Sequence, residues 1–121
     1  MPTELENILK KARKDKDVIA VILFGSHARG TATRGSDIDI CLVLEKTSKD
    51  LEKRIEYMIS DNLDVHVFQS LPIYVRIRVL GEGKVLVSKD DDFLYALAIR
   101  TIQEYEDFRK YHMQYLEALY G

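Results

Sequence analysis

The 121-residue chain has one cysteine, two prolines, no tryptophan and no long hydrophobic run. The single Cys41 has no partner for an internal disulfide and sits in an apolar segment, which predicts a small core residue in a reducing cytoplasm. No apolar run approaches the roughly 20 residues that cross a bilayer, and no signal-like segment opens the chain. These absences predict a cytoplasmic protein without a membrane anchor.

Neither sign of charge is in excess. Eighteen basic and twenty acidic side chains give a formal net charge of −2. Proteins that bind nucleic acid unaided usually carry a basic face, so strong nucleic-acid binding is not expected. The basic run at 10–16 is interrupted by acids and fits a solvated helix face. No cysteine or histidine pair has the spacing of a zinc site.

The length and a hydrophobic content of 46% suit one compact domain over 1–121, with a catalytic core over about 1–90 and a C-terminal helix over about 91–121. The periodicity predicts an α+β, two-layer fold in which helices pack on one face of a small mixed β-sheet. We expect helices over 3–15, 48–60 and 71–80, and strands over 18–24, 37–44, 63–68 and 84–88.

Two of these helices carry specific expectations. In the helix over 48–60, the residues expected to face the core are Leu51, Ile55, Met58 and Ile59. In the helix over 71–80, Arg76 and Arg78 either approach a phosphate or face water, and water is the favoured reading.

A glycine and a serine follow the strand over 18–24 directly. Gly25 can take the positive φ of a sharp turn, and Ser26 supplies a hydroxyl and a backbone amide where a short helix begins. Such a turn presents donors to an anion, and Arg29 lies within reach of the same phosphate. The segment therefore predicts a phosphate site.

Three aspartates lie on strands that can neighbour this turn. Asp37 and Asp39 alternate on one strand, which places both on one face, and Asp64 lies on the strand over 63–68. Hard oxygen ligands beside a phosphate favour magnesium or manganese, and the spacing fits two ions. Asp64 could also help deprotonate an attacking hydroxyl.

Each half of this pattern has an ordinary explanation. A Gly-Ser pair alone is usually a turn, and an Asp-x-Asp pair alone is usually a solvated strand end. Two acids that open an apolar strand beside a Gly-Ser turn are costly without a ligand, which favours a metal–nucleotide site. His27 either touches the nucleotide or is a solvent-facing loop residue, and His66 either lines the site or supports it from behind.

The stretch GSHARGTATRGSDID resembles the signature of the nucleotidyltransferase superfamily of DNA polymerase β type, and most closely that of the minimal nucleotidyltransferases (MNT proteins). The resemblance covers residues from about 18 to 68 and implies a polymerase β-like nucleotidyltransferase core. It implies that Gly25 and Ser26 bind phosphates, that Asp37 and Asp39 bind metal and that Asp64 is the third acid. Two further matching positions, Ser36 and Arg29, are implied phosphate-binding residues.

The same resemblance implies a reaction and a partner. Many MNT proteins are antitoxins that transfer AMP from ATP to a tyrosine of an HEPN-type RNase toxin. Two alternatives remain open: transfer to a small hydroxylated molecule in the aminoglycoside manner, with a dimer completing the pocket, and a non-catalytic module that covers a toxin.

Neither proline nor glycine occurs from Asp90 to Tyr120. This predicts a helix of roughly 45 Å, longer than a domain of this size can cover. We expect residues 94–105 to pack either on the core or on a partner, and residues 106–120 to contact a partner, either a toxin or a second copy of the chain. The expected helix seam consists of Leu94, Ala98, Thr101, Tyr105, Phe108, His112, Tyr115 and Leu119.

Overall fold

The computed structural model describes residues 3–33 and 35–121. The strands are β1 (Val18–Phe24), β2 (Ile38–Leu44), β3 (Leu63–Val67) and β4 (Lys84–Ser88), and the helices are α1 (Thr3–Lys14), α2 (Ser26–Arg29), α3 (Asp50–Tyr57), α4 (Ile73–Glu82) and α5 (Asp91–Tyr120). The strands form one sheet in the order β3-β2-β1-β4. Strand β1 is antiparallel to β2 and β4, whereas β2 and β3 are parallel. The predicted mixed sheet is confirmed.

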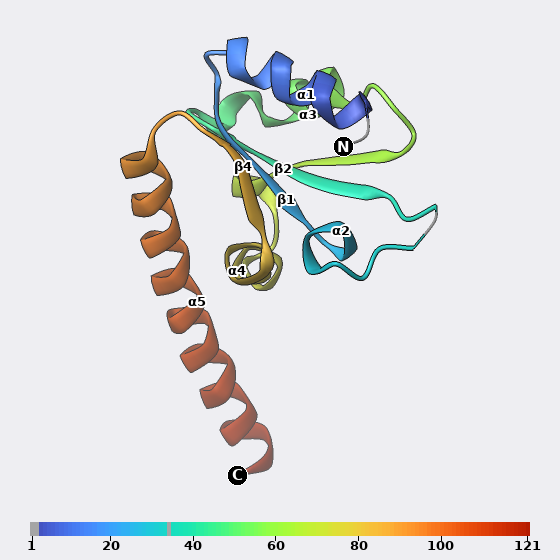
Figure 1. Cartoon of the computed structure of the whole chain (residues 1–121). Helices are drawn as coiled ribbons and strands as arrows, with labels where there is room; N and C mark the ends of the chain where they lie inside the picture. Colours follow the sequence, from blue (N-terminus) through green and yellow to red (C-terminus); the bar gives the residue numbers. More distant parts are fainter. Residues whose placement is uncertain (1–2, 34) are drawn as a thin grey trace.

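Helices cover both faces of this sheet, so the expectation that they pack on one face is wrong (Figure 1). Even-numbered residues of β2, such as Ile40 and Leu42, pack with α1 and with Tyr57 of α3. Odd-numbered residues, such as Cys41 and Val43, pack with α4 and α5. The two-layer prediction failed because β1 and β2 are apolar on both faces, and each apolar face needs its own helices.

Helix α1 forms as its sequence predicts. Its apolar residues recur at helical spacing and are all buried, namely Leu5, Ile8, Leu9 and Ala12.

Cys41 of β2 is fully buried, and burial raises the pKa of its thiol to about 12, with a further contribution from the Asp39 and Asp64 charges. Among the described residues no helix has the length and apolar character needed to cross a membrane.

Helix α3 differs from its prediction in length and in orientation. It buries Lys53 and Tyr57, whereas the residues expected to face the core are exposed. The Lys53 ammonium lies 2.8 Å from Asp15 and 3.0 Å from Asp17, and the Tyr57 hydroxyl donates to Asp15 at 2.9 Å. These polar contacts fix the orientation of the helix. They leave four apolar residues exposed to solvent, two in α3 and two directly after it. We call this set the α3 apolar stripe: Leu51, Ile55, Met58 and Ile59.

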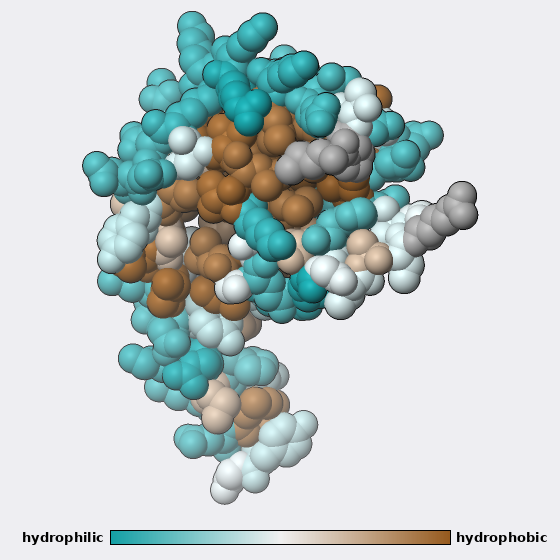
Figure 2. Space-filling model, viewed as in Figure 1, coloured by the Kyte–Doolittle hydropathy of each residue, from teal (hydrophilic) through white to brown (hydrophobic). Residues whose placement is uncertain are grey.

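Helix α5 packs on the domain only along its first part. Asp90 caps it by accepting from the Phe93 amide at 3.0 Å, and Leu97 and Thr101 are its buried residues. From α4, Arg76 donates two hydrogen bonds to Glu104, at 2.8 and 3.0 Å, which join the two helices. Beyond this contact α5 extends away from the domain, and Figure 2 shows a mixed polar and apolar surface on the protruding part.

The predicted seam of α5 is therefore divided. Thr101 is buried and Leu94, Ala98 and Tyr105 are half-buried, so residues 94–105 pack on their own domain. Farther along, Phe108 and Tyr115 are exposed, and the Phe108 ring stacks on His112 of the same helix.

Candidate active site

Gly25 ends β1 in a conformation that only glycine adopts readily. Its φ is 73° and its ψ is −155°, and α2 begins at the next residue, Ser26. A β-carbon at Gly25 would overlap the carboxylate of Asp39. The missing side chain therefore lets the backbone of the turn lie directly against an acid of the neighbouring strand.

We expect Gly25→Ala to lower the free energy of unfolding by about 2–3 kcal/mol, because backbone strain and steric overlap add. Displacement of the Asp39 carboxylate should also slow the nucleotidyl transfer that the sequence resemblance implies, by about tenfold to a hundredfold. Urea unfolding and an activity assay measure the two effects. Gly30→Ala is the matched control, since Gly30 also has a positive φ but no atom near a new β-carbon. Equal losses in the two variants would contradict the role of the Asp39 contact.

Three side chains converge beside this turn. Asp39 of β2 and Asp64 of β3 are direct partners in the parallel pairing, so both lie on the same face. His66 follows two residues later on that face, and its Nε2 lies 3.0 Å from Asp64 Oδ2. Ligand atoms of Asp39, Asp64 and His66 all lie within 4.8 Å of one another. The predicted meeting of Asp39 with Asp64 is thus present.

Asp37 lies outside this cluster. Strand β2 begins at Ile38, so Asp37 precedes it and is exposed. Its place is on the wall of an open cavity of about 720 Å³ that Asp64, Met58 and Ile59 also line. Its charge nevertheless contributes to the raised pKa of Asp39, and His66 is the third side chain of the cluster.

The electrostatics of the cluster suit a cation. The pKa of Asp39 is raised, first by burial and then by the charge of Asp64 and a hydrogen bond with it, with a smaller contribution from Asp37 and an opposing one from His66. Two carboxylates this close repel unless a positive charge lies between them. Oxygen ligands with one imidazole fit a divalent metal ion.

A basic cavity of about 180 Å³ is lined by Gly25 and by residues of α2 and α4. Its charged lining residues are Arg29, Arg78 and Glu82, and its apolar ones are Phe24, Val75 and Val79. The guanidinium of Arg29 lies 3.3 Å from the Glu82 carboxylate. The two arginines of α4 differ in their contacts. Arg76 pairs with Glu104, whereas Arg78 lines the cavity.

The loop between α2 and β2 has internal bonds that the sequence did not reveal. The Ser36 hydroxyl accepts from the Thr33 amide at 2.9 Å, and the Ser36 carbonyl lies 3.2 Å from His27 Nε2. Ser36 thus helps to close a turn, and His27 connects that turn to α2. Ser26, the first residue of α2, is half-buried.

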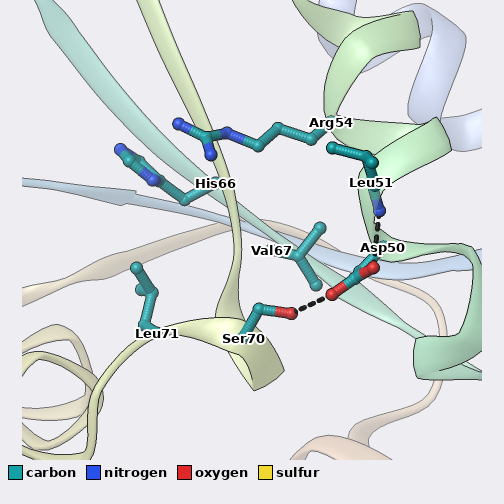
Figure 3. Close-up of a pocket in the computed structure, with 7 residues that line it drawn as sticks. All are labelled: Asp50, Leu51, Arg54, His66, Val67, Ser70 and Leu71. Carbon is teal, nitrogen blue, oxygen red and sulfur yellow. Dashed lines mark hydrogen bonds between the residues drawn. The ribbon is translucent and has the colours of Figure 1, made fainter.

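A third cavity, of about 150 Å³, opens beside His66 (Figure 3). Arg54 extends from α3 across β3, and its Nε donates to the Val65 carbonyl at 2.9 Å. The other lining residues include Leu51, Val67 and Leu71, and Asp50 and Ser70 are joined by a hydrogen bond. The His66 ring also makes an edge contact with the Phe24 ring, at 5.9 Å between the ring centroids.

Comparison with protein families identifies this arrangement. The model described as polymerase beta, nucleotidyltransferase matches residues 6–92, which include both strands of the acid cluster and the Gly25 turn. The chain belongs to the polymerase beta nucleotidyltransferase family. The resemblance seen in the sequence is therefore confirmed at the level of the family.

The protein adenylyltransferase MntA of Shewanella oneidensis is 29% identical over 92 residues, which cover 71% of this chain and 65% of MntA. In the curated relatives the matched stretches span between 33% and 65% of those proteins' own length.

Solved structures share the fold over nearly the whole chain. A toxin–antitoxin with AMP-PNP has a TM-score of 0.72 at 22% identity, covering 99% of this chain and 100% of that chain. A complex of tri-AMPylated Shewanella oneidensis HEPN toxin with MNT antitoxin has a TM-score of 0.66 at 16% identity, covering 98% and 94% of the two chains.

Proposed function

We propose that this protein is a metal-dependent nucleotidyltransferase that transfers AMP from ATP to a tyrosine hydroxyl of an HEPN-type RNase toxin and thereby acts as its antitoxin. The observation that carries the proposal is the cluster of Asp39, Asp64 and His66 directly against the Gly25 turn. The names of MntA and of the complex with a tri-AMPylated HEPN toxin support the choice of AMP and of the acceptor.

Each residue has a proposed task. Gly25, Ser26 and Arg29 bind the triphosphate, with Ser36 supporting the loop beside it. Asp37, Asp39 and Asp64 hold two Mg²⁺ ions, and Mn²⁺ would suit the same oxygen ligands. When bound, these ions neutralise charge on the triphosphate and on the departing pyrophosphate.

The acceptor hydroxyl must be deprotonated as it attacks. Asp64 is the proposed proton acceptor, and His66 at 3.0 Å orients its carboxylate. The acceptor oxygen forms a bond to the α-phosphorus, the bond from that phosphorus to the bridging oxygen breaks, and pyrophosphate leaves. Attack occurs in line, so the acceptor approaches from the side opposite the leaving group.

The positions of these residues in the sheet support different strands for the two sides. Gly25 and the basic cavity lie at the β1 end, Asp39 lies on the central β2, and Asp64 lies on β3. The acceptor therefore approaches over β3. On that side Leu51 of the α3 apolar stripe lines the cavity at His66, and Met58 and Ile59 line the cavity at Asp64. Exposed apolar residues at that entrance fit a protein surface better than a polar small molecule.

The direct test incubates the chain with Mg²⁺, ATP labelled in the α-phosphate, and an HEPN-type protein encoded beside its gene. Label on a tyrosine of that protein is the expected result. Label on a small hydroxylated molecule alone would favour the aminoglycoside-type reaction, and inhibition of the RNase without any label would favour the non-catalytic module.

We expect Ile55→Glu, in the middle of the α3 apolar stripe, to raise the KM for the protein acceptor by about tenfold or more, because a buried charge at an interface costs over 1 kcal/mol. Binding of ATP should stay unchanged, since the stripe lies on the acceptor side. Val85→Glu is the matched control, an exposed apolar residue on β4 at the opposite edge of the sheet. If Ile55→Glu and Val85→Glu transfer AMP equally well, the stripe does not bind the acceptor.

A further inference from the structure

The basic cavity between α2 and α4 contains a charge arrangement that the Gly-Ser signature does not explain. Arg78 and Glu82 lie one turn apart on α4 and line the same cavity as Gly25. Glu82 pairs with Arg29 across the cavity, with the two side chains about 40% exposed. Among the acids of the described residues, none lies within ion-pair distance of Arg78.

We propose that Arg78 binds the β- and γ-phosphates of the nucleotide, and that Glu82 is an internal anion which the phosphates displace from Arg29. The inference rests on the proposed function, since it assumes that Gly25 binds the triphosphate. It decides for Arg78 between the two alternatives that the sequence leaves open, phosphate or water, and adds Glu82 to the site.

The pairing of Arg29 with Glu82 suits displacement. A partly exposed pair with a 3.3 Å separation contributes little stability, so its loss costs little. A phosphate offers the guanidinium two charged oxygens in a fork geometry, which makes stronger hydrogen bonds. The two arginines and one carboxylate carry a net charge of +1, so an anion is attracted even while Glu82 remains in place.

The neighbouring arginine of α4 shows why Arg78 is the residue concerned. Arg76 has its guanidinium engaged by Glu104 and by the Leu71 carbonyl, so it is held in a structural contact. Arg78 is exposed and lines the cavity that Gly25 borders. Position on α4 also explains why the local sequence pattern around Gly25 gives no sign of it.

Isothermal titration with Mg²⁺ and either AMP-PNP or AMP tests this proposal on the full chain. We expect Arg78→Gln to weaken AMP-PNP binding about tenfold, as for the loss of charge-assisted hydrogen bonds, and to leave AMP binding unchanged. Glu82→Gln should strengthen AMP-PNP binding about threefold or more, because the competing carboxylate is gone. Arg13→Gln, an exposed arginine of α1 on the other face of the sheet, is the charge-matched control.

The outcomes separate the inference from the proposed function. If the wild-type chain binds no AMP-PNP, the nucleotide site itself is wrong and the inference is lost with it. If the wild type binds and Arg78→Gln binds equally well, only the role of Arg78 is overturned. Equal weakening of AMP and AMP-PNP would overturn the assignment to the β- and γ-phosphates, and weaker binding by Glu82→Gln would overturn the displacement. Melting temperatures of the variants show that each is folded.

Discussion

Asp39→Asn is expected to reduce nucleotidyl transfer by about a hundredfold to a thousandfold. Metal ions supply several kcal/mol of charge stabilisation in phosphoryl transfer, and about 1.4 kcal/mol corresponds to a tenfold change in rate. Asp39 lies between Gly25 and Asp64, so an amide there removes a negative ligand from the centre of the site. Transfer of label from ATP measures the loss, with Asp92→Asn, on the exposed first turn of α5, as the control.

The same variant gives a result that does not depend on turnover. Without metal, Asp39→Asn should melt at a higher temperature than the wild type, because the repulsion between Asp39 and Asp64 is removed. Mg²⁺ or Mn²⁺ should raise the melting temperature of the wild type and have a much smaller effect on the variant. A variant that loses activity but keeps the full thermal response to metal would exclude Asp39 as a metal ligand.

Lys53→Met is expected to lower the free energy of unfolding by about 3–5 kcal/mol, the cost of removing one partner from a buried ion pair. The Lys53 side chain is only 11% exposed and lies within 3.2 Å of oxygens of Asp15, Asp17 and Glu56. Methionine would fill the space but leave these carboxylates without their cation. Chemical unfolding at neutral pH measures the change. Lys49→Met removes a more exposed lysine, 3.6 Å from Asp17, and should cost less than about 1 kcal/mol.

The pH dependence of this loss has a defined sign. Burial opposes ionisation of Asp15, but hydrogen bonds from Lys53, the Asp17 amide and Tyr57 outweigh it and lower the pKa of the carboxyl. A carboxyl with a lowered folded-state pKa stabilises the fold above its unfolded pKa, here 3.8, and loses that contribution as the pH falls through the folded value. The difference between the wild type and Lys53→Met should therefore shrink below about pH 4. A constant difference down to pH 2 would contradict the pairing.

The sequence predicts those parts of the fold that depend on local patterns. Continuous apolar runs correctly indicate β1 and β2, and alternation correctly indicates β3. The positive φ of Gly25 was predictable, because a sharp turn from a strand into a short helix needs a backbone conformation that glycine adopts readily. The meeting of Asp39 with Asp64 followed from the expectation that their strands are neighbours.

The orientation of α3 was not predictable from its own residues. Its apolar positions form a regular helical stripe, and by that pattern Ile55 should be buried. Asp15 and Asp17 precede β1 and bind Lys53 through contacts 38 and 36 residues apart in the chain, which no local pattern reveals. The ion pairs of the buried Lys53 with Asp15 and Asp17 thus determine which side of α3 faces the core.

Long-range contacts likewise hid part of the candidate site. Arg78 and Glu82 line the same cavity as Arg29 only because the fold brings α4 near α2, and the link of His27 to Ser36 depends on the path of the intervening loop. His66 could be placed on the Asp64 face from alternation alone. Its distance from the carboxylate required the structure.

The division of α5 into a packed part and a protruding part has a consequence for local unfolding and amide hydrogen exchange. Its first part shares the cooperative unfolding of the sheet, because Leu97 and Thr101 are buried against the core. The part after Glu104 has only its own backbone hydrogen bonds and a few side-chain pairs, such as Arg109 with Glu106. An isolated helix of that length is marginal in water. Amide hydrogens of one continuous helix should therefore exchange on two timescales, slow before Glu104 and fast after it.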